Sequence, residues 1–133
     1  MPWYVALYLA IFTVITGVAL VGGWREGSAP RRQLILDALD NLGWIALASA
    51  YWREEVRDFL GPMALPLVVI CFVWFFKSME PAVDWLRRHP RLDEGRVREI
   101  AWFGFTVNLI TVAPAMWWGL HVCIDAVNAM LAS

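Results

Sequence analysis

Residues 1–24 read MPWYVALYLAIFTVITGVALVGGW and contain no Asp, Glu, Lys or Arg. About 20 consecutive apolar residues are enough for a helix to cross the hydrocarbon core of a bilayer. The stretch therefore predicts a transmembrane helix over residues 3–23. It lacks the basic start and the small-residue cleavage site of a secretory signal, so we expect this helix to remain in the mature protein.

Three more apolar stretches follow, at residues 34–52, 59–76 and 100–120. The last two contain no charged residue, whereas the stretch 34–52 carries Asp37 and Asp40 and on hydropathy alone is either a span or an interfacial helix. Hydrophobic residues make up 60% of the 133 residues, well above the share usual in soluble domains. The sequence predicts an all-α integral membrane protein, a bundle of four transmembrane helices forming one domain over residues 1–133.

The distribution of basic residues supports four spans rather than three. With four, one side of the membrane receives nine of the 11 Lys and Arg residues, and the other side receives only Arg53 and Arg57. The nine are Arg25, Arg31, Arg32, Lys77, Arg87, Arg88, Arg91, Arg96 and Arg98. Cytoplasmic loops are enriched in Lys and Arg, so both termini are expected outside the cytoplasm, in a multi-pass protein of a cell membrane, most naturally a bacterial inner membrane.

Local signals refine the helix limits. Asp93 is a good N-cap for a helix that runs from Glu94 to about Met130, longer than a bilayer is thick. Between the third and fourth spans, residues 82–88 have an apolar and a charged side and predict a short amphipathic helix along the cytoplasmic interface, which His89 and Pro90 should end. Three prolines are candidates for kinks in the third and fourth spans: Pro62, Pro66 and Pro114.

Polar residues inside the spans are the first candidates for a functional site. Asp37, Asp40 and Asn41 share one helical face, and a carboxylate facing lipid would cost several kcal/mol. At a similar depth on the other spans lie Thr16, Cys71, Asn108 and Thr111. Three interpretations stay open: a hydrogen-bonded layer that fixes helix register, a proton or cation site around Asp40 and Asn108, and an ion pair between Asp40 and another subunit. Asp37, nearer the interface, is expected to reach toward Arg31 or Arg32.

A second polar group lies toward the outer side. His121, Asp125 and Asn128 form one stripe, and the second loop contributes Glu54 and Glu55 on the same side. A solvated rim of charged residues is the plainer interpretation; a metal site would need Glu54 or Glu55 as further ligands. Haem would need a second axial histidine from another subunit. We expect no metal and no other cofactor, and we expect Cys71 and Cys123 to be small buried hydrophobic residues.

Small residues mark faces where helices can approach closely. The first span carries a stripe of Ala6, Ala10, Thr13 and Gly17, and the second carries Gly43, Ala46 and Ala50. In lipid, such stripes favour helix contacts. The third span is bulky instead, which assigns it to lipid or to a flat protein contact.

These features favour a non-enzymatic membrane protein, a subunit or assembly factor of a larger membrane complex or a homo-oligomer. No GxSxG, HExxH, P-loop or GxGxxG motif occurs, and a net charge of -1 gives nucleic acid no electrostatic reason to bind. The first alternative is a proton- or cation-coupled channel or transporter that uses Asp40 and Asn108. The second is a membrane effector, toxin or immunity protein in defence.

The charge distribution generates a topology prediction: Gly27 and Arg91 lie in the cytoplasm and both termini outside it. In a variant with Cys71 and Cys123 replaced, a cysteine introduced by Gly27→Cys should resist an impermeant thiol reagent in intact cells and react after lysis. Labelling in intact cells would overturn the predicted orientation.

Overall fold

The computed structural model describes residues 1–27, 30–88 and 90–133, and within these ranges the chain is helical with no strand. The helices are α1 (Trp3–Glu26), α2 (Arg31–Trp52), α3 (Glu54–Leu60), the 3₁₀ turn η1 (Gly61–Met63), α4 (Ala64–Lys77), α5 (Met79–Arg87) and α6 (Glu94–Ala132). Three of the helical stretches are long and apolar enough to cross a membrane: Trp3–Glu26, Glu54–Arg87 and Glu94–Ala132. The expected bundle of four long helices is thus present, and α2 is its least apolar member.

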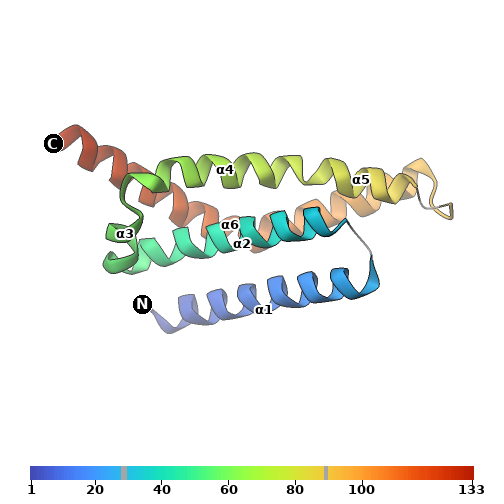
Figure 1. Ribbon diagram of the computed structural model, residues 1–133, viewed down its shortest axis with the longest axis horizontal. Helices are drawn as coiled ribbons and strands as arrows, with labels where there is room; N and C mark the ends of the chain where they lie inside the picture. The colour runs from blue at the N-terminus through green and yellow to red at the C-terminus, as the bar shows by residue number, and fades with distance from the viewer. Residues whose placement is uncertain (28–29, 89) are drawn as a thin grey trace.

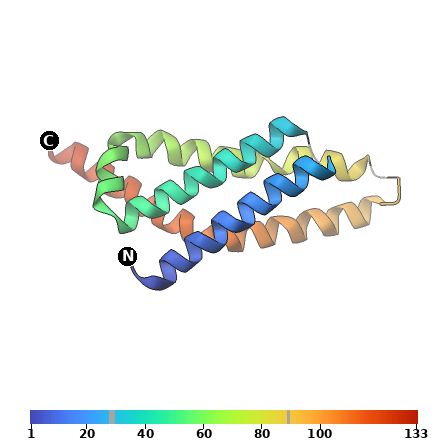
Figure 2. The same cartoon turned by 60° about the horizontal axis from the view of Figure 1, so that its bottom comes forward.

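Both termini lie at one end of the bundle, together with α3, and we call this the termini end (Figure 1). The C-terminal ends of α1 and α5 and the N-terminal ends of α2 and α6 lie at the opposite end, which we call the loop end (Figure 1). Helices α1 and α2 run obliquely to α4, α5 and α6 (Figure 2). Both termini lie at the same end because the chain runs from one end of the bundle to the other an even number of times.

Helix α2 occupies the centre of the bundle, because it packs against α1, α4 and α6. The core takes its side chains from all four long helices. They include Val5, Leu9 and Phe12 of α1, Trp44, Leu47 and Ala48 of α2, Val68, Cys71 and Phe75 of α4, and Val112, Ala115 and Met116 of α6. The Trp44 side chain is fully buried and meets the Phe72 ring edge to face at 5.0 Å between ring centroids. Trp44 is therefore a packing residue between α2 and α4.

The segment between α4 and α6 differs from the expectation of a helix lying along the interface. Residues 82–88 belong almost entirely to α5, which begins at Met79 and continues the direction of α4 with only Ser78 between them (Figure 1). The Ser78 N–H donates to the Trp74 carbonyl oxygen, so the backbone ladder runs on through the junction. The segment is therefore a helix that lengthens α4. Of the two residues expected to end it, His89 lies outside the described residues.

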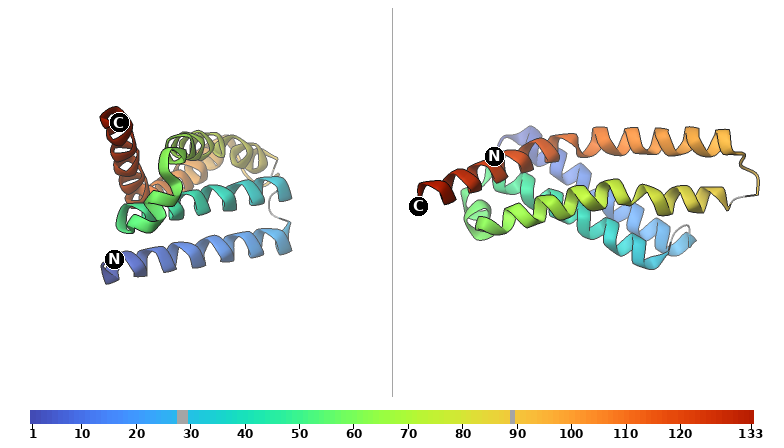
Figure 3. Two further views of the ribbon diagram at one scale, coloured as in Figure 1. Left: turned by 60° about the vertical axis from the view of Figure 1, so that its left-hand side comes forward. Right: turned by 90° about the horizontal axis from the view of Figure 1, so that it is seen from above.

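Helix α6 begins as the sequence indicates and bends near its proline. The Asp93 carboxylate accepts a hydrogen bond from the Arg96 N–H at 2.8 Å, the geometry of an N-cap. Pro114 lies inside the helix, where it has no N–H to donate to the Ile110 carbonyl. Figure 3 shows that the C-terminal part of α6, drawn in red, changes direction and leaves the bundle. Pro62 and Pro66 instead occupy η1 and the first turn of α4, where missing donors cost little.

The two stripes of small residues have different surroundings. At Gly43 a Cβ atom would lie 2.6 Å from the Cys71 Sγ, so the stripe on α2 is used for a close approach to α4. The stripe on α1 is exposed at Ala6, Ala10, Thr13 and Gly17. Helix α4, expected to face lipid or a flat contact, buries one side through Val68, Cys71 and Phe75 and exposes the other.

The contact between Gly43 and Cys71 generates a stability prediction. Gly43→Ala should destabilise the protein by about 1–3 kcal/mol, because the new methyl group overlaps the Cys71 sulfur. Adding Cys71→Ala should recover most of that loss, because it removes the overlapping atom. Thermal unfolding in detergent measures both effects, and Gly22→Ala is the control since nothing lies within 4 Å of its Cβ. Additive effects of Gly43→Ala and Cys71→Ala would contradict the contact.

Candidate functional site

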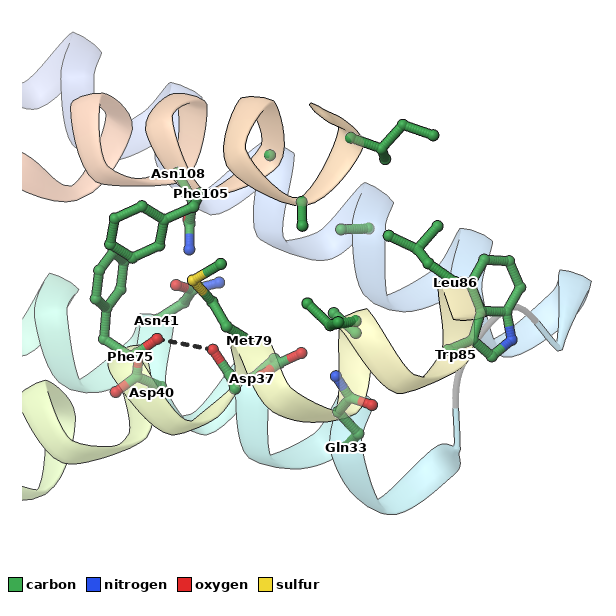
Figure 4. Close-up of a pocket in the computed structure, with 17 residues that line it drawn as sticks. Gln33, Asp37, Asp40, Asn41, Phe75, Met79, Trp85, Leu86, Phe105 and Asn108 are labelled. Carbon is green, nitrogen blue, oxygen red and sulfur yellow. Dashed lines mark hydrogen bonds between the residues drawn. The ribbon is translucent and has the colours of Figure 1, made fainter. Parts of the chain in front are cut away.

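A cavity of about 500 Å³ lies in the half of the bundle toward the loop end (Figure 4). Its walls come from α2, α5 and α6, with Phe75 of α4 and Ala19 of α1. It has both polar and apolar surfaces. The polar lining residues are Gln33, Asp37, Asp40, Asn41, Ser78 and Asn108. The apolar lining includes Phe75, Met79, Ala82, Val83, Trp85, Leu86, Ile100, Ala101, Gly104 and Phe105.

The cavity exists because three of the residues that α5 and α6 contribute to its lining are small and because α1 covers it poorly. Ala82, Ala101 and Gly104 leave space between α5 and α6, and no atom lies within 4 Å of the position that a Cβ on Gly104 would take. The buried residues of α1 all fall in its first half, where they pack toward the termini end. The second half contributes only Ala19 to the lining. The small residues and the poor cover by α1 thus leave a cavity beside Asp37 and Asp40.

Asp37 is held by α4 rather than by the basic residues of the preceding loop. Its Oδ1 accepts a hydrogen bond from the Trp74 indole Nε1 at 2.8 Å. Arg31, one of the partners expected for Asp37, instead lies over the Trp24 ring at 4.6 Å from the ring centroid. The indole N–H of a tryptophan on α4 can donate to a carboxyl group inside the bundle, so no arginine from the loop has to reach it. The expectation that Asp37 reaches back toward Arg31 or Arg32 is therefore corrected.

Asp40 lies one turn deeper and is less well satisfied. The Cys71 thiol and the Trp44 indole lie beside its carboxyl group. Even so, Oδ1 is enclosed and accepts no well-formed hydrogen bond from any described residue, and the Trp44 Nε1 also lacks an acceptor there. The Cys71 thiol points instead to the main-chain oxygen of Asp40, at 3.9 Å. A buried carboxyl oxygen without a donor lowers the stability of the folded protein, so Asp40 is a candidate for a functional role.

Neither aspartate has a basic partner in the part of the chain that the structure describes. The ion pairs found there join Arg57 to Glu54 and Arg87 to Glu94, both away from the cavity lining. The lining itself includes no Lys, Arg or His. The cavity is therefore a site with two carboxyl groups and no positive charge of its own.

Asn41 and Asn108 complete the polar part of the cavity. Figure 4 shows the two side chains extending toward each other from α2 and α6. Asn108 is exposed and Asn41 is half-buried, so both amides remain open to a further partner. Asp40 and Asn108 share the cavity, as the interpretation of a common polar site requires, although no hydrogen bond joins them among the described contacts.

The threonines are not part of this group. The hydroxyls of Thr16 and Thr111 donate to the carbonyl oxygens of Phe12 and Val107, one turn back in their own helices, at 2.8 Å each. Neither residue lines the cavity. Threonine can satisfy its hydroxyl within its own helix, so equal depth in the sequence does not make it a member of a layer.

The outer group of candidates is dispersed. The His121 Nδ1 lies 2.9 Å from the Trp117 carbonyl oxygen, and its ring packs against Trp117 and Tyr51. Glu54 pairs with Arg57, Glu55 is exposed, and Asp125 lines a separate cavity of about 460 Å³ with Arg57 and Asp58. Within residues 1–27, 30–88 and 90–133, no three His, Cys, Asp or Glu side chains gather as a metal ion would require. The arrangement fits the plainer interpretation of a charged rim.

Sequence reasoning missed several residues of the cavity. Gln33 lies one turn before Asp37 on the same face of α2, a spacing that would have identified it. Phe75, Phe105 and Trp85 form apolar walls, and nothing in their spacing separates them from ordinary packing residues. Ser78 donates to the Phe75 carbonyl at 2.9 Å (Figure 4).

Comparison of the chain with protein-family models, with curated proteins and with solved structures finds no match. The site is therefore interpreted from its own geometry.

The hydrogen bond from Trp74 to Asp37 generates a prediction. Trp74→Phe should destabilise the protein by about 1–3 kcal/mol, because the half-buried carboxyl group of Asp37 loses its donor while an aromatic ring is kept. In an Asp37→Leu background the same change should cost much less. Thermal unfolding of the four proteins in one detergent gives the coupling, and equal losses in both backgrounds would show that the bond contributes nothing. Trp102→Phe is the control, since Trp102 is 65% exposed.

Proposed function

We propose that this chain is a multi-pass membrane protein in which α2 crosses the bilayer together with the three apolar helical stretches, with both termini outside the cytoplasm. Three observations support four crossings. The termini lie at the same end of the bundle, α2 has 22 residues and is thus long enough to cross a bilayer, and its neighbours cover it on several sides. The loop end also carries most of the basic residues, as a cytoplasmic face does.

Within that setting we propose that the protein works as a non-enzymatic subunit or assembly factor, bound to other membrane helices or to further copies of itself. The observation that carries this proposal is the exposed small-residue face of α1, formed by Ala6, Ala10, Thr13 and Gly17. Gly17 would have no atom within 4 Å of a Cβ. Large apolar side chains interact well with lipid, whereas small residues in a row allow another helix to approach closely.

A second candidate function is transport or conduction coupled to a proton or cation. It is favoured by one observation, the cavity that contains Asp37, Asp40, Asn41 and Asn108 and no basic residue. Intramembrane carboxyl groups commonly mark ion pathways in transporters. Four helices enclose little space, so this candidate also needs an assembly of subunits.

The assembly proposal predicts that the purified protein is larger than one 15.2 kDa chain. Native mass spectrometry from nanodiscs should detect an oligomer or a hetero-complex. Gly17→Leu should shift it toward the single chain, because a bulky residue blocks the close approach. Gly22→Leu is the matched control, since Gly22 is equally uncrowded and lies off the stripe. A single 15.2 kDa species from the wild-type protein would refute the assembly proposal.

A further inference from the structure

We propose that the cavity between α2, α5 and α6 binds an organic ammonium ion with an apolar body, held at the charged end by Asp37 and Asp40 and along its length by aromatic walls. The proposal concerns binding alone. It goes beyond the assembly proposed above and stands whether or not the bound cation is transported.

The two carboxyl groups of the cavity favour a positively charged partner. Asp37 and Asp40 both line it, and neither forms an ion pair with a described residue. Asp37 accepts one hydrogen bond from Trp74, which leaves its second oxygen available. The Oδ1 of Asp40 is enclosed and has no donor, so the ligand is expected at the other oxygen of Asp40. Carboxyl groups in an apolar surrounding are normally paired, so the missing charge is best supplied by the occupant of the cavity.

The shape and chemistry of the walls favour an organic cation over a bare metal ion. A volume of about 500 Å³ is within the range of small-molecule pockets and far exceeds that of one ion. The described residues also offer no group of three metal-ligating side chains. Aromatic faces attract organic cations, and Phe75, Phe105 and Trp85 supply them here.

The two ends of the cavity differ, and this difference orients the ligand. Figure 4 shows Asp40, Asn41 and Asn108 toward one end, with Trp85 and Leu86 at the other, nearer the loop end of the bundle. An ammonium group at the first end can donate to carboxyl and amide oxygens. The rings of Phe75 and Phe105 lie at this charged end, and an apolar body then extends past Met79 toward Trp85 and Leu86 (Figure 4).

The test is equilibrium binding of phenylbutylamine to the full chain in phosphatidylcholine nanodiscs, with empty nanodiscs as background. Phenylbutanol and phenylbutyrate serve as neutral and anionic analogues of similar size. We expect saturable binding of the amine, with the two analogues weaker by about tenfold or more, because each loses the charge-assisted hydrogen bonds. Equal binding of amine and alcohol, or no binding above empty nanodiscs, would overturn the proposal.

Variants test the charged end and the space separately. Asp40→Asn should weaken amine binding by about tenfold or more while leaving the weak binding of the alcohol unchanged. Gly104→Leu should abolish binding of both compounds by filling the cavity, without altering a polar group. Gly22→Leu, on α1 and away from the lining, should bind the amine as wild type does.

The space-filling variant keeps the test decisive where Asp40→Asn fails to fold, because it leaves every carboxyl group in place. Folding of each variant is checked by circular dichroism and by elution volume in detergent. A folded Gly104→Leu protein that binds the amine as wild type does would locate binding elsewhere and refute the proposal. The oligomeric state measured for Gly17→Leu is a separate readout, so failure of assembly and failure of ligand binding are distinguishable.

Discussion

The structure depends on the packing that holds α2, the least apolar of the long helices, among its more apolar neighbours. Helix α2 carries Asp37, Asp40 and Asn41, and it is the one long helix whose composition does not by itself suit a membrane. Its three neighbours, α1, α4 and α6, are more apolar than α2 and pack around it. Two of its own large apolar residues, Trp44 and Leu47, are fully buried in those contacts, whereas Ile35, Leu39 and Leu42 are exposed. Because α2 is not among the helices apolar enough to cross a membrane, we ascribe its position in the bundle to packing against these neighbours.

Close packing of α2 has opposite results at its two ends. Toward the termini end, small residues such as Gly43 and Gly119 bring α2 against α4 and α6 with little space left. Toward the loop end, Ala82, Ala101 and Gly104 are equally small, and no atom lies within 4 Å of the position of a Cβ on Gly104, so a cavity remains. Small residues therefore allow a close helix contact at Gly43 and Gly119 and leave space at Gly104. The difference lies in whether the facing helix places a side chain against them.

The helices and their limits were largely predictable, because apolar periodicity, caps and prolines act locally. Asp93 as an N-cap and the great length of α6 are examples. The course of residues 82–88 was not, because an amphipathic pattern suits a helix that prolongs α4 as well as one lying on a surface. For the site, helical spacing grouped Asp37, Asp40 and Asn41 correctly. It could not exclude Thr16 and Thr111 or find Phe105, since a hydroxyl's choice of partner and the position of a void depend on packing between helices.

The central position of α2 has a consequence for how the protein is made. Ribosomes deliver helices in chain order, so α2 leaves the exit tunnel before α4 and α6, the helices that later enclose its aspartates. In the membrane setting proposed above, the nascent α2 would have only α1 beside it during that interval, so the hairpin of α1 and α2 would stay at the insertion machinery or at the membrane surface. In that setting, insertion would be completed only when α4 and α6 arrive, and a chain truncated after α2 would be a substrate for quality-control proteolysis.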